Sequence, residues 1–129
     1  MKFKKFLILF LFFSCGFIYS QSPIVSADGI QLYCPGNKLH VATSFSITPA
    51  GSETGQKGLY IQISQGYVRG EDKLSVLNPL SFPNIKTDES ISWSDSEGKL
   101  TLTHKTNPEI LYAEIEALLL DVVFESTSL

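Results

Sequence analysis

Residues 60–76 read YIQISQGYVRGEDKLSV, in which two alternating segments lie on either side of a glycine-flanked corner. Ile61 and Ile63 fall on the same face of an extended chain, which is the pattern of a half-buried strand. Gly66 and Gly70 bracket the middle of the stretch, where glycine suits a positive φ or a close backbone approach. The stretch therefore predicts a strand, a tight corner and a second strand.

Similar short segments recur along the rest of the chain, with turn residues between them. This spacing is typical of an antiparallel sandwich, and each segment brings two or three large apolar residues to one face. The pattern predicts an all-β antiparallel β-sandwich with strands near residues 30–33, 41–48, 59–64, 73–77, 91–94, 100–103 and 121–125. We expect a hairpin turn at 94–99, SDSEGK. The side chains expected to converge in the interior are Ile61, Trp93, Leu102 and Phe124.

Two other segments depart from this pattern. Residues 49–58, PAGSETGQKG, have no large apolar residue, so they predict an exposed and mobile loop. In NPEILYAEIEALLL, at 107–120, Asn107 is a candidate helix N-cap, with Pro108 at the first helical position and Glu109 in the first turn. The residues that share the apolar helical face are Leu111, Ile115, Leu118 and Leu119. We expect one short crossover helix before the last strand.

The chain begins with three lysines among apolar residues, MKFKKFLILFLFF, followed by small and polar residues. This is the layout of a secretory signal peptide, so we expect residues 1–20 to be removed and 21–129 to form one domain. The apolar run is shorter than the roughly twenty residues of a spanning helix, so no membrane span is expected after cleavage. A lipid-anchor site at Cys15 stays open as the alternative. The expected location is secreted or on the outer cell surface.

Removal of this leader changes the charge and the cysteine content. It takes three lysines and no acid, so the formal charge falls from −3 to −6. An acidic surface without basic clusters argues against nucleic acid as a partner. Cys34 is then the one cysteine left, so no internal disulfide is expected. We expect Cys34 to be a small buried core residue, with an intermolecular disulfide as the alternative.

The sequence carries no recognisable catalytic pattern. His40 and His104 stand on separate predicted strands, no serine has a GxSxG context, and Cys34 has no activating partner beside it in sequence. The two histidines and the cysteine could form a zinc site if they met in space. This is the weaker alternative, because histidines on strands more often face solvent or are hydrogen-bonded. We therefore expect a domain that is not an enzyme.

Acids and tyrosines near the predicted turns are the candidate binding residues. Carboxylates are the hard oxygen ligands that calcium prefers, although the EF-hand spacing is absent and turn acids are commonly just solvated. Calcium is the one cofactor left open, and its candidate ligands are Glu71, Asp72, Asp95 and Glu97. The candidate glycan-binding residues are Tyr60 and Tyr67.

Several segments resemble one known module in order and spacing. They are QLYCPGNKL at 31–39, YIQISQGYVRGEDKLSV at 60–76, ISWSDSEGKLTLT at 91–103 and YAEIEALLLDVVFESTS at 112–128. These segments resemble the amino-terminal cadherin-like, immunoglobulin-like β-sandwich module of flavobacterial secreted adhesin-like proteins, of the gliding-motility-associated, type IX secretion class. The resemblance implies a non-enzymatic surface or secreted module that spaces or presents downstream binding domains.

The chain departs from this family in two respects. Relatives continue after the last strand with an Asn-Pro turn and a further strand, so the resemblance implies a truncated module and the first piece of a longer protein. Relatives also often carry an acidic run where residues 48–54 read TPAGSET, which weakens the argument for calcium. The expected partners are neighbouring domains of a longer surface protein and an extracellular glycan or protein. The alternative function is a carbohydrate-recognition module that binds glycans through loop tyrosines.

Overall fold

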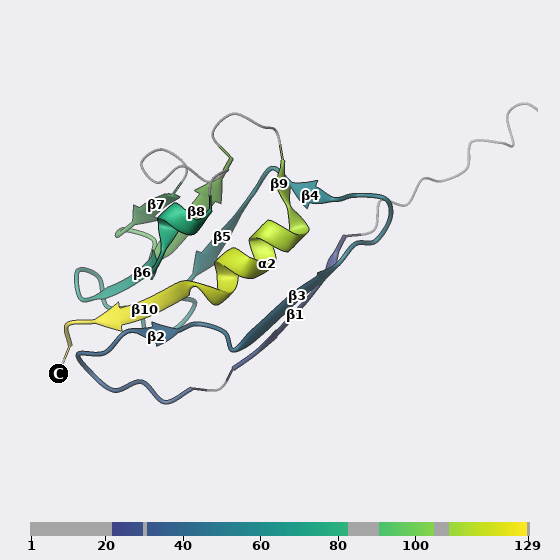
Figure 1. The fold of residues 1–129 in the computed structure, drawn as a ribbon. Helices are drawn as coiled ribbons and strands as arrows, with labels where there is room; N and C mark the ends of the chain where they lie inside the picture. Colours follow the sequence, from purple (N-terminus) through teal and green to yellow (C-terminus); the bar gives the residue numbers. More distant parts are fainter. Residues whose placement is uncertain (1–21, 30, 83–90, 105–108, 129) are drawn as a thin grey trace, which may run out of the picture.

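The structure is a computed structural model that describes residues 22–29, 31–82, 91–104 and 109–128 (Figure 1). Over these ranges the chain consists mainly of short antiparallel strands with one short α-helix, so the predicted β-rich composition is confirmed. The elements are β1 (Ile24–Asp28), β2 (Leu39–His40), β3 (Ser44–Thr48), β4 (Gly55–Gln56), β5 (Gly58–Gln62), β6 (Asp72–Val76), η1 (Pro79–Ser81), β7 (Ile91–Ser94), β8 (Lys99–Thr103), β9 (Ile110–Leu111), α2 (Tyr112–Leu120) and β10 (Val122–Ser126).

Within the described ranges the strands form four antiparallel sheets. Two sheets have three strands, in the orders β2-β10-β6 and β5-β8-β7, and two have two strands, β1-β3 and β4-β9. The last strand, β10, is therefore the central strand of its sheet, with β2 on one side and β6 on the other. The helix α2 lies beside the β1-β3 ribbon and leads directly into β10 (Figure 1).

The core is one apolar cluster to which both three-stranded sheets and α2 contribute. Its buried members are Leu74, Leu100, Leu102, Ile110, Tyr112, Ile115, Leu118, Leu119 and Val122. Ile61, Trp93 and Phe124 are partly buried and pack against this cluster, so the predicted convergence of these side chains with Leu102 is confirmed. Full burial of an aliphatic side chain contributes about 1.5–3 kcal/mol, so this cluster is the main source of stability.

The glycine-flanked corner has the predicted geometry. Gly66 and Gly70 have φ angles of 71° and 80°, which L side chains rarely adopt. The corner carries the chain from β5 in one three-stranded sheet to β6 in the other. The predicted hairpin turn between β7 and β8 is also present, and Gly98 in it has a φ of 63°.

The predictions for the first half of the chain need two corrections. The strand expected at 30–33 is absent over its described residues 31–33, because the side chains of Gln31 and Tyr33, and not a backbone ladder, connect this segment to its neighbours. The expected strand at 41–48 is instead the shorter β3, and β1 was not predicted. The cause is a change of partner, since Val41 N–H donates to the Val122 carbonyl of β10 and Thr43 N–H to the Asp28 carbonyl of β1.

The predicted helix start was wrong. Ile110 pairs with Gln56 in the β4-β9 sheet, and the N–H of Tyr112 donates to the Thr54 carbonyl at 2.8 Å. These backbone bonds keep 110–111 extended, so α2 begins at Tyr112, and Leu111 is exposed instead of lying on the buried face. The proposed cap at Asn107 and Pro108 lies outside the described residues.

The segment 49–58 is less irregular than predicted. Its residues up to Thr54 are mostly exposed, as expected for a loop, but Gly55 is buried in β4 and Gly58 begins β5. A Cβ at Gly55 would collide with the carbonyl oxygen of Ile110. Glycine is therefore required here because the backbone of β9 approaches too closely for a side chain.

Cys34 does not belong to the core. Its side chain is exposed, in a turn where Asn37 N–H donates to the Cys34 carbonyl, so the expected burial was wrong. The proposed signal peptide at 1–20 and the alternative lipid site at Cys15 lie outside the described residues. Among the residues that the structure describes, no helix has the length and hydropathy to cross a membrane.

Candidate functional site

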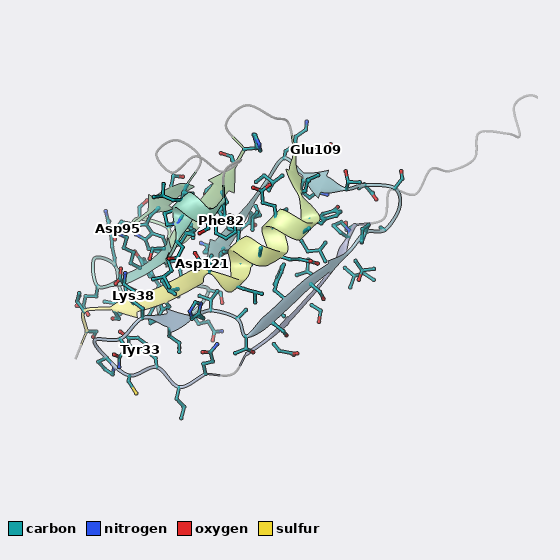
Figure 2. The ribbon with its side chains drawn as sticks, viewed as in Figure 1. Tyr33, Lys38, Phe82, Asp95, Glu109 and Asp121 are labelled. Atoms are coloured by element: carbon teal, nitrogen blue, oxygen red, sulfur yellow. The ribbon has the colours of Figure 1, made fainter. Side chains whose placement is uncertain are left out.

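The candidate site is the corner between β5 and β6 together with the β7-β8 turn, and Asp95 connects the two. The hydroxyl of Tyr67 donates to the Asp95 carbonyl at 2.6 Å and lies 3.2 Å from Asp95 Oδ1. Oδ1 also accepts from Gly70 N–H at 3.2 Å, and Oδ2 accepts from Arg69 Nε at 3.1 Å. Three groups of the corner therefore bond to Asp95, which Figure 2 labels.

The ring of Tyr67 fits closely against the same turn. Its centroid lies 6.1 Å from that of Trp93 in an edge-to-face arrangement, a geometry that aromatic pairs prefer. A Cβ at Gly98 would lie 2.9 Å from Cγ of Tyr67, so the ring covers the bare glycine backbone. Tyr67 thus joins the corner to the turn through its ring as well as its hydroxyl.

Hydrogen bonding and desolvation in this cluster shift two pKa values in opposite directions. The hydrogen bond from Arg69, with the one from Gly70, lowers the pKa of Asp95 below its ordinary 3.8 despite partial desolvation. Desolvation and the hydrogen bond to Asp95 raise the pKa of Tyr67 above 10.0. At neutral pH the cluster therefore holds an ionised Asp95 and a neutral Tyr67.

Asp72 and Glu71 belong to the corner but do not join Asp95 in a ligand set. The Asp72 side chain is buried, and its Oδ2 accepts from the N–H of Val68 at 2.7 Å. Glu71 is exposed, and its backbone carbonyl accepts from Thr127 N–H. The buried Asp72 carboxylate fixes the corner from the inside, a role that the sequence did not suggest.

Glu97, in the turn between β7 and β8, forms an ion pair with Lys99 at the start of β8. Its Oε2 lies 2.7 Å from Nζ of Lys99, which, with Ser94, lowers the pKa of Glu97 below 4.5. The structure does not bring the four predicted calcium ligands together as one set, since the described residues hold no group of three acids, histidines or cysteines suited to a metal ion. The carboxylates of Asp72, Asp95 and Glu97 already accept hydrogen bonds from protein groups, so this donor set does not fit calcium well.

The two candidate tyrosines differ in what they offer to a ligand. Tyr60 lies on strand β5 and not in a loop, and 66 % of it is exposed, with Nζ of Lys99 at 5.8 Å from its ring centroid. Tyr67 is half-buried, and its hydroxyl is bonded to Asp95. Tyr60 is therefore the more exposed of the two candidate tyrosines.

The two histidines occupy different places. His40 is exposed on β2, with Nδ1 2.7 Å from the carbonyl of Leu120 at the end of α2. His104 follows β8. The exposed Cys34 completes no metal-binding group with them among the described residues.

An open groove of about 310 Å³ lies beside the core between β2 and β5. Its polar wall includes Gln31 and Gln62, but the amide of Gln31 donates to the His40 carbonyl and that of Gln62 to the Glu97 carbonyl. Its apolar wall includes Ile61, Leu74 and Phe124, which belong to the core or pack against it. The groove therefore presents few polar groups to a ligand.

Sequence reasoning missed the contact that closes the edge of β10. The hydroxyl of Tyr33, labelled in Figure 2, accepts from the N–H of Ser126 at 2.8 Å and donates to its carbonyl at 3.0 Å. Its ring meets Phe124 edge to face at 4.9 Å between centroids. In the sequence, Tyr33 stands out only as an aromatic residue in a polar segment. That pattern does not identify a hydrogen-bond partner 93 residues away.

The described bonds thus hold secondary-structure elements to one another, through Tyr67 and Asp95 at the corner and through Tyr33 at β10.

Comparison of the chain with protein-family models, with curated proteins and with solved structures found no match.

Proposed function

We propose that this chain is a non-enzymatic module of a secreted or cell-surface protein, which spaces or presents binding domains that follow it. In this proposal the two three-stranded sheets are the layers of an immunoglobulin- or cadherin-like β-sandwich, of the kind found in gliding-motility-associated adhesin-like proteins. The segments at 31–39, 60–76, 91–103 and 112–128 resemble that module and support the assignment.

The observation that carries the proposal is the central position of β10. This strand pairs with β6 over five residues and with β2 over two, and Tyr33 bonds to Ser126 beyond the end of β2. Hydrogen bonds between antiparallel strands lie perpendicular to the strands, so a pull along β10 loads them all together. A domain attached after β10 would thus be connected to the most firmly bonded strand of its sheet.

Pulling on single molecules in two geometries tests this mechanical role. Force applied between cysteines at 127 and 77 shears β6 against β10, because these positions lie at opposite ends of the strand pair. Force applied between 127 and 71 peels the same pair from one end, and it serves as the matched control. We expect a clearly higher unfolding force in the shear geometry, and equal forces would contradict a load-bearing role for β10.

Export is tested separately. The full chain with a carboxy-terminal tag, produced in a bacterium with a Sec pathway, should leave the cytoplasm and begin at Gln21 by amino-terminal sequencing. Cys15→Ser should leave this processing unchanged if the leader is a simple signal peptide. Retention in the cytoplasm with an intact leader would contradict a secreted or surface location, and lipidation that depends on Cys15 would select the tethered alternative.

Carbohydrate recognition is the second candidate function, and the exposure of Tyr60 favours it. Thr101 and Ser92 stand opposite Tyr60 in the register of β5, β8 and β7, so a polar surface surrounds an aromatic ring. Aromatic rings with neighbouring hydroxyls suit the apolar face and polar edge of a sugar. Glycan-array binding that Tyr60→Ala abolishes and Tyr67→Phe leaves intact would support this function over a spacer role.

A further inference from the structure

The outer edge of β1 is the most exposed strand edge in the described part of the chain. All five residues of β1 are exposed, and in the described ranges this strand pairs with β3 alone. Figure 1 shows the β1-β3 ribbon along the side of α2, with β1 outermost. An unprotected strand edge is a template for pairing with another strand.

The other edge of this ribbon, that of β3, lies against α2. The N–H of Ile47 in β3 points away from β1 and donates to Oε1 of Glu116 in α2 at 2.8 Å. In an antiparallel pair, two residues that stand opposite each other direct their N–H and carbonyl groups either both toward the partner strand or both away from it. Val25 stands opposite Ile47, so its N–H and carbonyl point away from β3. Ala27, two residues on, does the same. The exposed edge of the ribbon in the described part of the chain is therefore that of β1.

We propose that β1 pairs with β1 of a second copy of this chain, in an antiparallel two-fold contact centred on Ser26. In this register Val25 of each copy lies opposite Ala27 of the other, and the outward N–H and carbonyl groups of both residues form four hydrogen bonds. A register centred on Val25 would place Ala27 opposite Pro23, which has no N–H. The sequence thus favours the Ser26-centred register.

Strand number favours a second copy as the occupant, and charge favours the antiparallel contact between the two copies. Asp28, whose Oδ2 accepts from Ser44 Oγ, lies at one end of β1, so the antiparallel contact places the two Asp28 residues at opposite ends. A parallel contact would place them side by side and would repel. A two-stranded ribbon is marginal by itself, whereas the pairing β3-β1-β1-β3 makes a four-stranded sheet.

Apolar side chains add to the contact. Val25 and Ala27 share a face with Ile47 and Phe45, their partners in β3, which pack against the core. Val25 is 58 % exposed in the single chain. Self-pairing would bring Val25 of each copy against Ala27 of the other on that face and remove apolar surface from water.

A cysteine cross-link tests the register in the chain purified after export, with Cys15 and Cys34 replaced by serine. In the proposed contact the two Ser26 residues form a non-hydrogen-bonded pair with Cα atoms about 4.5 Å apart, within disulfide range. Ser26→Cys should therefore give a covalent dimer on mild oxidation. Ser46→Cys is the matched control, because the two Ser46 residues would be three strand spacings, about 14 Å, apart and cannot be bridged.

Sedimentation equilibrium over a range of concentrations tests the affinity. Ala27→Pro removes an outward N–H from each copy without touching the bonds to β3, so we expect dimerisation about tenfold weaker or more. Val25→Lys, which places a charge on the edge, should weaken it as well, while the control Leu80→Lys at an 89 % exposed position should not. Circular dichroism melts verify that each variant is folded.

A chain that stays monomeric, or whose dimer tolerates both edge variants, would overturn the proposal. Dimers that form without a Ser26→Cys cross-link would overturn the register. Capture of an extended strand from another protein by a monomeric chain would also count against self-pairing.

Discussion

The hydroxyl of Tyr33 makes two hydrogen bonds to the backbone of Ser126, one to its N–H and one to its carbonyl. A side chain thus does at the end of β10 what a further residue of β2 would do. Ser126 is buried, so both of its backbone groups depend on this hydroxyl or on rearrangement of the sheet edge.

Tyr33→Phe should therefore lower the free energy of unfolding by about 1–3 kcal/mol, because it leaves buried backbone groups unsatisfied while keeping the ring against Phe124. Urea denaturation measures the change. Tyr60→Phe removes an exposed hydroxyl and should change the free energy by less than about 0.5 kcal/mol. Equal effects of the two variants would show that the Ser126 bonds contribute nothing.

Asp95 should contribute to the loss of stability in acid. Its pKa in the folded chain is held below 3.8 by Arg69 and Gly70, so its contribution is present above 3.8 and is lost as the pH falls through the folded value. Asp95→Asn should flatten that part of the stability profile, measured by denaturation between about pH 2 and 6. If the loss of stability at low pH is unchanged in this variant, other carboxylates cause it.

Tyr67 should act at the alkaline end. Its pKa is raised above 10.0, so its contribution is complete below 10.0 and is lost as the pH rises through the folded value. Tyr67→Phe should remove this alkaline loss and reduce stability at neutral pH. The ultraviolet titration of tyrosinate locates the transition, and Tyr60→Phe, which should leave the late-titrating tyrosine in place, is the control.

Two glycines with similar φ angles separate backbone strain from packing. Gly98 and Gly66 have φ angles of 63° and 71°, but only at Gly98 would a Cβ meet the ring of Tyr67. Gly66→Ala should cost about 1–2 kcal/mol for the left-handed conformation alone. Gly98→Ala should cost about 2–4 kcal/mol, because it also displaces Tyr67 from Asp95. Thermal denaturation compares them, and equal costs would mean that Tyr67 moves without loss.

Gly55→Ala should disrupt the β4-β9 sheet, because a Cβ there would collide with the backbone of Ile110. We expect a loss of about 2 kcal/mol or more, with faster amide hydrogen exchange at Gln56. Gly51→Ala is the control, since a Cβ there meets only the flexible side chain of Glu53 at 3.1 Å. Normal exchange at Gln56 in Gly55→Ala would contradict the close approach.

The parts of the fold that are encoded locally could be predicted. Strands β5 and β8 and the hairpin to β7 have a two-residue alternation, and the corner has glycines where the backbone needs positive φ. The convergence of Trp93 and Leu102 follows from the same alternation, because it decides which side chains face inward.

Features that depend on distant partners could not be predicted. Strand β1 has no buried residue, so its five residues carry no burial signal, and its partner β3 is not the next strand in sequence. The start of α2 is decided by Thr54 and Gln56 far upstream, whose backbone bonds keep 110–111 extended. Propensity in a short segment is weaker than such tertiary contacts.

The candidate site shows the same division. The sequence placed Tyr67 in a corner and Asp95 in a turn, but their contact spans 28 residues and depends on two sheets being folded. Polar side chains in a corner and a turn suggested ligand-binding residues, but both of these are half-buried. The hydrogen bonds of Asp95 to Tyr67 and to Arg69 show that these residues connect two loops.

The central place of β10 also constrains the order of folding. Its partners β2 and β6 precede it by about eighty and fifty residues. Because both of them pair with β10, their sheet cannot form until β10 has left the ribosome or the translocation channel. Contacts of such long sequence separation slow folding. The nascent chain should therefore stay unfolded until residue 126 emerges, and it should then acquire protease resistance in one cooperative step.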